Sequence, residues 1–288
     1  MIKFKKTFLC FSVVALIVLT AVQQCFAATY LTSDGFYYLP DDKYNATVYG
    51  CNDNKTELVF PDRLDNYNVR SIADYSFINN GNITSIDFTN AKYLRSVGYL
   101  SFSGCSNVKS IVLPYWINSF DFGSFQNCTA LTQIGLYARV NKITEQCFYG
   151  CSSLTCIDLP DSVKSIERFA FGKCKSLSEV YIPTSVTSIA PNAFRNSPNV
   201  TIKGSYGSYA EEYAKANNIP FNGISAYDVG DVNMDGGINI LDATLVQKYV
   251  VGIVELSAEQ KHLADYNNDG DITVVDATGI QKFIVHLN

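Results

Sequence analysis

Hydrophobic positions in the middle of the chain recur every 23 residues. A phenylalanine marks each unit, with a small residue before it and, in the first four units, a cysteine three positions after it. The phenylalanines are Phe102, Phe125, Phe148, Phe171 and Phe194, and the small residues are Ser101, Ser124, Cys147, Ala170 and Ala193. Leucines at 131, 154 and 177 keep the same spacing. A fixed period of this length predicts a stack of equivalent structural units.

Each unit contains a short strand. In Ile157–Leu159 apolar and polar side chains alternate with the period of a half-buried strand, and Pro160 ends the run. A unit of this size cannot bury its own apolar stripe, so neighbouring units must cover one another. We therefore expect a mainly β solenoid that begins with an irregular unit over Val69–Phe77 and Ile83–Val97. A second apolar column closes each coil, at Phe120, Ile143, Ile166 and Ile189.

These units resemble the leucine-rich repeats of BspA-like bacterial surface proteins, whose pattern is roughly AFxxCxxLxxIxIPxSVxxI. The match is clear in Cys151–Ile166, which reads CSSLTCIDLPDSVKSI. The resemblance implies a leucine-rich-repeat solenoid over residues 28–221, with an N-terminal cap at about 28–75, repeats at about 76–203 and a C-terminal cap at 204–221. In the C-terminal cap we expect a short helix after Ser208 and then a strand. The first regular unit departs from the pattern at Pro114, Tyr115 and Trp116.

The cysteine column is interpreted as a row of buried free thiols. Stacked strands lie about 4.8 Å apart, so neighbouring thiols come within disulfide range, but parallel side chains do not easily reach the dihedral angle of a disulfide. Cys147 is expected to be buried too, whereas Cys156 stands in an outward column and is expected to be reactive. The column consists of Cys105, Cys128, Cys151 and Cys174.

Residues 1–27 have the pattern of a secretory signal peptide. Three lysines precede an apolar run from Phe8 to Val22, and small residues follow at Ala27 and Ala28. The alternative, a membrane anchor, would need a longer span and a basic stop-transfer cluster. We expect cleavage near Ala27 and a secreted, extracellular protein without membrane insertion, held at a cell surface or in a complex through a partner.

The net charge of the chain limits the classes of partner that we expect it to bind. Removal of a leader with three lysines and no acidic residue takes the formal net charge from −5 to −8. An acidic chain without a run of Lys and Arg repels phosphate, so nucleic acid is not expected as a partner. Divalent cations are better candidates. Zinc is not indicated, because the chain has two histidines and no CxxC pair.

Two acidic loops near the C-terminus, 34 residues apart, have the spacing of calcium-binding loops. Asp231–Asp242 reads DVNMDGGINILD, and Asp265–Asp276 reads DYNNDGDITVVD. Oxygen donors fall at loop positions 1, 3, 5, 7, 9 and 12, with glycine at the sharp turn of position 6. The sequence therefore predicts two bound Ca²⁺. The candidate ligands are Asp231, Asn233, Asp235, the Gly237 carbonyl, Asn239 and Asp242, then Asp265, Asn267, Asp269, the Asp271 carbonyl, Thr273 and Asp276.

An apolar helical segment follows each loop. A helix over Glu259–Ala264, with a Ser257–Gln260 capping box, precedes the second loop, and no helix precedes the first. This arrangement resembles a type I dockerin across residues 228–288, after a linker at 222–227. The resemblance implies a small α-helical domain with two EF-hand-like loops that docks on a cohesin module of a scaffoldin in a cellulosome-like complex.

The same resemblance assigns the cohesin contacts to loop positions 10 and 11 and to three helix positions in each copy. Leu241 and Val275 are equally compatible with the core. The near identity of QKY and QKF in the two copies suggests a twofold pseudo-symmetry and, as a hypothesis, two binding orientations. The implied contacts are Ile240, Leu241, Gln247, Lys248, Gly252, Val274, Val275, Gln281, Lys282 and His286. The residues expected in the core are Ile238, Val246, Tyr249, Ile272, Ile280 and Phe283.

Three functions remain open for the repeat domain. The first is a non-catalytic binding or adhesion module for an unknown protein or carbohydrate ligand, displayed through the dockerin. Tyr115, Trp116 and Tyr137 are a candidate aromatic platform for it. The second is a dockerin-borne enzyme of polysaccharide degradation, but no pair of carboxylates in the repeats suggests a cleft for glycoside hydrolysis. The third is an inhibitor or recruiter of another enzyme. The sequence favours the first, so no catalytic residue is assigned.

Overall fold

The computed structural model describes residues 31–52, 54–113, 115–136 and 139–285. The expected signal peptide lies outside the described residues, as do Pro114, Tyr137 and His286. Within the described ranges, no helix has the length and apolar character needed to cross a bilayer.

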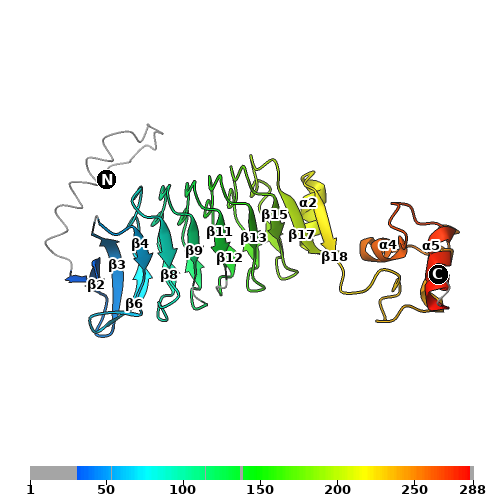
Figure 1. The fold of residues 1–288 in the computed structure, drawn as a ribbon, viewed down its shortest axis with the longest axis horizontal. Coiled ribbons are helices and arrows are strands. Elements are labelled where there is room, and N and C mark those ends of the chain that lie inside the picture. The colour runs from blue at the N-terminus through cyan, green and yellow to red at the C-terminus, as the bar shows by residue number, and fades with distance from the viewer. Residues whose placement is uncertain (1–30, 53, 114, 137–138, 286–288) are drawn as a thin grey trace, which may run out of the picture.

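The repeats stack as short parallel strands on two faces (Figure 1). Strands pair one period apart, so that Ile157 lies beside Val180 and Ile166 beside Ile189. One face carries β4 (Glu57–Val59), β7 (Ser85–Asp87), β9 (Ser110–Val112), β11 (Gln133–Gly135), β13 (Cys156–Asp158), β15 (Glu179–Tyr181), β17 (Thr201–Ser205) and β18 (Phe221–Ile224). The other carries β3 (Asn45–Cys51), β6 (Tyr67–Ile72), β8 (Ser96–Val97), β10 (Ser119–Phe120), β12 (Lys142–Ile143), β14 (Ser165–Ile166) and β16 (Ser188–Ile189). The predicted solenoid is confirmed.

Both ends of the stack are covered. At the N-terminal end, β1 (Leu31–Ser33) and β2 (Phe36–Pro40) form a hairpin against β3, and β5 (Arg63–Leu64) pairs with β6. At the other end, α2 (Tyr209–Ala216) and then β18 follow the last coil, which is the helix and strand expected after Ser208. These caps keep the open apolar ends of the stack away from water.

The phenylalanine column forms the centre of the core. Consecutive rings from Phe102 to Phe194 are stacked, with centroids 5.3 to 5.7 Å apart. The irregular first unit joins the same column, because Phe77 stacks on Phe102 at 4.9 Å. The stack repeats at close to the strand spacing, since each ring is carried by one coil.

The predicted buried thiols are also confirmed. Cys105, Cys128, Cys151 and Cys174 are free and buried, and each Sγ donates to a phenylalanine carbonyl of a preceding coil at 3.1 to 3.3 Å. In the fifth unit the Ser197 hydroxyl makes the same bond to the Phe171 carbonyl, at 2.7 Å. Cys147 is buried and Cys156 is exposed, as expected.

The C-terminal domain is helical. It contains α3 (Ile240–Val250), α4 (Ala258–Ala264) and α5 (Val274–Ile284), and α3 packs against α5. Val246 and Ile280 lie in its core, together with Val232, Leu256 and Ala264. The Ser257–Gln260 capping box is present at α4. Figure 1 shows these helices beyond β18, at the far end of the molecule from the N-terminal cap.

Candidate metal centre and docking surface

The two acidic loops have matching hydrogen bonds. In the first loop the Asp231 carboxylate accepts from the backbone nitrogens of Asp235 and Gly236, at 3.1 and 2.9 Å. In the second loop Asp265 accepts from Asp269 and Gly270, both at 3.0 Å. Position 1 therefore holds each loop in a tight turn around its own carboxylate.

The turns need a left-handed backbone at two positions. Met234 and Gly236 have φ of 59° and 92°, and Asn268 and Gly270 have 56° and 91°. Glycine adopts such angles without the steric cost that a Cβ brings, which is why position 6 is glycine in both loops. The two loops thus share one backbone conformation, as their sequences predict.

Positions 9 and 12 connect each loop to its helix. Asn239 caps α3 and Thr273 caps α5, each in a capping box with the aspartate three residues later. Asp242 and Asp276 are fully buried, and each also accepts from the amide of position 3, at 2.8 and 3.2 Å. The carboxylate at position 12 thereby fixes where the helix begins and draws the first half of the loop toward it.

The donor set fits Ca²⁺. Each loop offers three carboxylates, two neutral side-chain oxygens and a backbone carbonyl within twelve residues, and a hard cation of this kind takes six to eight oxygen ligands. In the described part of the chain no three His, Cys, Asp or Glu side chains gather closely enough to hold a metal by themselves. The carboxylates are instead directed at backbone amides, but each retains further lone pairs. The loops therefore match calcium in chemistry and backbone shape.

The residues implied as cohesin contacts lie mainly on the exterior. Ile240 and Leu241 are 55% and 60% exposed, and Val274 and Val275 are 58% and 59% exposed. Leu241 and Val275 are thus surface residues and not core. Gln247, Lys248, Gly252 and Lys282 are exposed, and Gln281 is partly buried. Two apolar pairs are thus exposed at matching helix starts.

One core assignment is wrong. Phe283 is 50% exposed, although its ring lies 6.4 Å from that of Tyr266. Its counterpart Tyr249 is partly buried and lies beneath the Lys261 ammonium. The helical period is the same in both copies, but α4 supplies this cover only to α3. Val246 and Ile280 are fully buried, and Ile238 and Ile272 pack against the core.

The family comparison agrees with both halves of the structure. Residues 50–201 match the BspA type leucine rich repeat region in six copies, and residues 229–285 match the dockerin type I domain. The chain belongs to the BspA type leucine rich repeat family. Its C-terminal domain is a type I dockerin.

One solved structure supports the fold of the repeat domain. The leucine-rich repeat protein TpLRR of T. pallidum is similar with a TM-score of 0.56 and 22% identity, over 69% of this chain and 100% of that chain. A leucine-rich repeat protein from Eubacterium ventriosum has 23% identity and a TM-score of 0.44, over 55% of this chain and 49% of that one. No curated protein matches the chain.

The dockerin domain contacts the end of the repeat domain. The Tyr206 ring stacks on His262 of α4 with centroids 5.0 Å apart, and the Ser225 hydroxyl donates to Glu259 at 2.8 Å. Burial and the nearby Glu211 and Glu259 carboxylates raise the pKa of Tyr206. Since β18 extends to Ile224, residues 222–224 of the expected linker belong to a strand, and the connection is short.

Sequence reasoning missed a group of arginines in the repeat domain. Arg70 and Arg95 lie in consecutive coils, as the hydrogen bond of 2.9 Å from the Arg95 nitrogen to the Arg70 carbonyl shows. Trp116 and Arg139 occupy the same position of consecutive units, 23 residues apart. The repeat period could have revealed these pairs, but the residues are far apart in sequence and form no run of basic residues.

Proposed function

We propose that this protein is a secreted, non-catalytic binding protein whose dockerin domain holds two Ca²⁺ and docks on a cohesin module of a scaffoldin. The repeat domain would be displayed on the resulting extracellular, cellulosome-like complex. The dockerin match supports docking as the role of the C-terminal domain, and both matched families are non-catalytic. The signal-peptide pattern of residues 1–27 supports secretion.

One observation carries the proposal. Two loops with the same hydrogen bonds each feed directly into a helix whose first two residues are exposed and apolar. The proposed ligands are the twelve loop residues named above, with side chains at positions 1, 3, 5, 9 and 12 and a carbonyl at position 7. When bound, the ion would neutralise three carboxylates per loop and so stabilise the orientation of the helix that follows.

In the first copy the proposed cohesin contacts are its apolar pair with Gln247, Lys248 and Gly252, and in the second they are its apolar pair with Gln281, Lys282 and His286. Leu241 and Val275 have equivalent places in α3 and α5. If the domain binds in two orientations, either copy suffices. A charge placed on one copy would then leave docking intact, and charges on both copies would abolish it.

The test measures docking of the full chain on type I cohesin modules by calorimetry. We expect binding in Ca²⁺ and none in chelator, because metal binding and folding of the loops are coupled. Leu241→Asp and Val275→Asp together should remove binding, while each single variant tests the two orientations. Val112→Asp, at a valine 41% exposed on β9, is the matched control and should bind normally. Unchanged affinity in chelator or in the double variant would refute the proposal.

A further inference from the structure

Four arginines and three aromatic residues gather on one side of the N-terminal half of the repeat domain. We call this group the arginine–aromatic cluster. Arg139 lies over the Tyr115 ring at 4.6 Å and over the Trp116 ring at 5.5 Å, and Arg95 lies 5.8 Å from the Trp116 ring. The members are Arg63, Arg70, Arg95, Arg139, Tyr93, Tyr115 and Trp116.

The cluster is positive in an acidic protein. It contains four of the six arginines of the chain, whose formal net charge is −5. The two salt bridges of the described residues, Lys142–Glu167 and Lys203–Glu179, do not involve these guanidiniums. The Asp42 carboxyl lies within electrostatic reach of Arg70: hydrogen bonds from Asn45 and Tyr44 lower the pKa of Asp42, and the Arg70 charge adds to this. Burial and the neighbouring Arg70 charge lower the pKa of Arg95. Guanidiniums held together without a salt-bridge partner favour an anionic ligand.

Three of the four guanidiniums are held in place by hydrogen bonds. The Arg139 side chain donates to the Tyr115 hydroxyl at 2.8 Å. Arg95 donates from one nitrogen to the carbonyls of Lys92 and Leu94, at 2.9 and 3.0 Å, and Arg63 donates to Asn68 at 3.0 Å. These bonds use only some of the five N–H groups of each guanidinium. Because the side chains are already ordered, a ligand would lose less free energy in fixing them.

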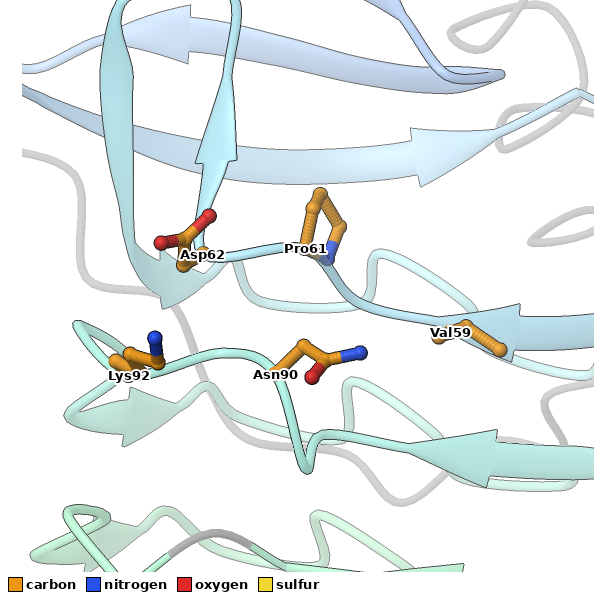
Figure 2. Close-up of a pocket in the computed structure, with 5 residues that line it drawn as sticks. All are labelled: Val59, Pro61, Asp62, Asn90 and Lys92. Carbon is orange, nitrogen blue, oxygen red and sulfur yellow. The ribbon is translucent and has the colours of Figure 1, made fainter.

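A shallow hollow adjoins the cluster. It has a volume of about 350 Å³ and is lined by Val59, Pro61, Asp62, Asn90 and Lys92. Figure 2 shows Lys92 and Asp62 on one side of it and Val59 on the other. Lys92, whose carbonyl accepts from Arg95, adds a cation to the hollow, and Asn90 offers an amide to a hydroxyl group. Asp62 is the acidic member, and it favours a ligand that carries hydroxyls as well as negative charges.

We propose that the arginine–aromatic cluster binds an acidic polysaccharide with one carboxylate per sugar, a polyuronate chain. Coils repeat about every 4.8 Å, which is similar to the advance of a pyranose chain per sugar. Arg70 and Arg95 of consecutive coils would then meet consecutive sugars, and Arg139, two coils beyond Arg95, would meet a later one. Guanidinium groups bind carboxylates through two parallel hydrogen bonds. The exposed faces of Tyr115 and Trp116, 49% and 45% exposed, supply apolar contact for sugar rings.

A polyuronate fits better than other polyanions. Phosphates of a nucleic acid strand lie farther apart than neighbouring coils. An acidic peptide offers neither sugar rings for Tyr115 and Trp116 nor ring hydroxyls for Asn90. The inference names the ligand class of the binding role proposed for the repeat domain, and it does not depend on docking.

The test titrates a short galacturonate oligomer into the full chain in CaCl₂. We expect binding that weakens as NaCl is raised, and no binding of the same oligomer with its carboxylates methyl-esterified. Arg95→Gln with Arg139→Gln should weaken binding at least about tenfold, because charge-assisted hydrogen bonds are lost. Arg139→Lys keeps the charge but loses the planar donor pair, so it should bind with intermediate affinity.

The matched control is Arg168→Gln with Arg195→Gln. It removes the same charge from the same domain, and Arg168 also lies near an aromatic ring, that of Phe169 at 6.0 Å. This control should bind the galacturonate oligomer like the unaltered chain. Cohesin affinity and circular dichroism should be unchanged in both variants, which separates this inference from docking. Equal loss in both double variants, equal binding of the esterified oligomer, or stronger binding of a glutamate peptide or an RNA oligomer would overturn it.

Discussion

Asp242 and Asp276 connect the loop to the helix in each half of the dockerin domain. Each is fully buried, accepts backbone hydrogen bonds from the loop and completes the capping box in the first turn of its own helix. A buried carboxylate is costly unless it is hydrogen-bonded or paired with a cation. These residues connect loop conformation to helix position, and the proposed calcium ion would act at the same points.

Replacement of Asp242 tests this connection. We expect Asp242→Ala to lower the free energy of unfolding of the dockerin domain in Ca²⁺ by about 2 to 3 kcal/mol, since buried amides lose their partner and the cap is lost. It should also reduce calcium uptake by one ion. Denaturant unfolding and calorimetry measure both effects.

Asp271→Asn is the control for that substitution. Asp271 is exposed, and at position 7 a loop residue offers its carbonyl rather than its side chain. Stability and calcium uptake should stay unchanged in this variant. An Asp242→Ala protein that behaves like Asp271→Asn would show that position 12 has no such role.

Individual residues differ in how well the sequence predicts them. The burial of Cys151 and the exposure of Cys156 follow from their positions in the repeat, because equivalent side chains of successive coils point to the same side of a regular stack. Phe283 does not follow from its column, because the element that covers its counterpart Tyr249 has no second copy. A period gives the direction of a side chain but not the presence of a neighbour.

At the scale of elements, the stacked coils place five buried thiols in the repeat domain. Burial raises the pKa of Cys105 and Cys174 to about 12 from 9.0, and it raises the pKa of Cys128, Cys147 and Cys151 as well. The folded coils therefore keep protons that the unfolded chain releases above pH 9.

This difference predicts alkaline unfolding. Below pH 9 the thiols are protonated in both the folded and the unfolded state, so they do not change the free energy of unfolding. Between pH 9 and the pKa of the folded state the unfolded chain binds fewer protons than the folded chain. The free energy of unfolding therefore falls as pH rises. The slope is about 1.4 kcal/mol per pH unit for each thiol once it is fully ionised in the unfolded state. Denaturant unfolding between pH 8 and 10 measures it.

Serine at two of these positions is the control. Cys128→Ser with Cys151→Ser keeps a donor toward the same carbonyls, as Ser197 does naturally, but cannot ionise. Its stability should fall less steeply above pH 9 than that of the unaltered chain. The same slope in both proteins would mean that the thiols do not cause the loss.

The elements of the repeat domain were largely predictable, because each signal lies in a short stretch of sequence: the 23-residue period, the alternation in the strands, and Ser208 at the start of the C-terminal helix. The residues with a left-handed backbone conformation could not be predicted from the sequence. Tyr75, Leu100 and Phe169 have φ between 48° and 59°, in a column where glycine occurs only at Gly123. Stacking of the coils imposes this conformation, so no residue type in the local sequence indicates it.

At the scale of the whole molecule, the two proposed binding surfaces lie toward opposite ends. The arginine–aromatic cluster belongs to the coils between β5 and β12, and the apolar pairs lie on α3 and α5 beyond β18 (Figure 1). The contact between Tyr206 and His262 joins the domains without involving either surface. A docked chain would therefore present the repeat domain outward from the cohesin.

The cluster itself shows what the sequence alone could not provide. The expectation that nucleic acid is not a partner rests on the absence of a run of Lys and Arg in the sequence, whereas the solenoid brings together Arg63, Arg70, Arg95 and Arg139 from several coils. By contrast, the calcium loops were fully visible, because all their proposed ligands lie within twelve consecutive residues.

Calcium uptake by the full chain tests the account most directly. Titration of the metal-free protein by calorimetry should give two Ca²⁺ per chain, one for an Asp231→Ala variant and none for Asp231→Ala with Asp265→Ala. Uptake should be accompanied by a gain of helix in circular dichroism, since α3 and α5 begin inside the loops. A chain that takes up no calcium, or a double variant that still takes up two ions, would contradict the account.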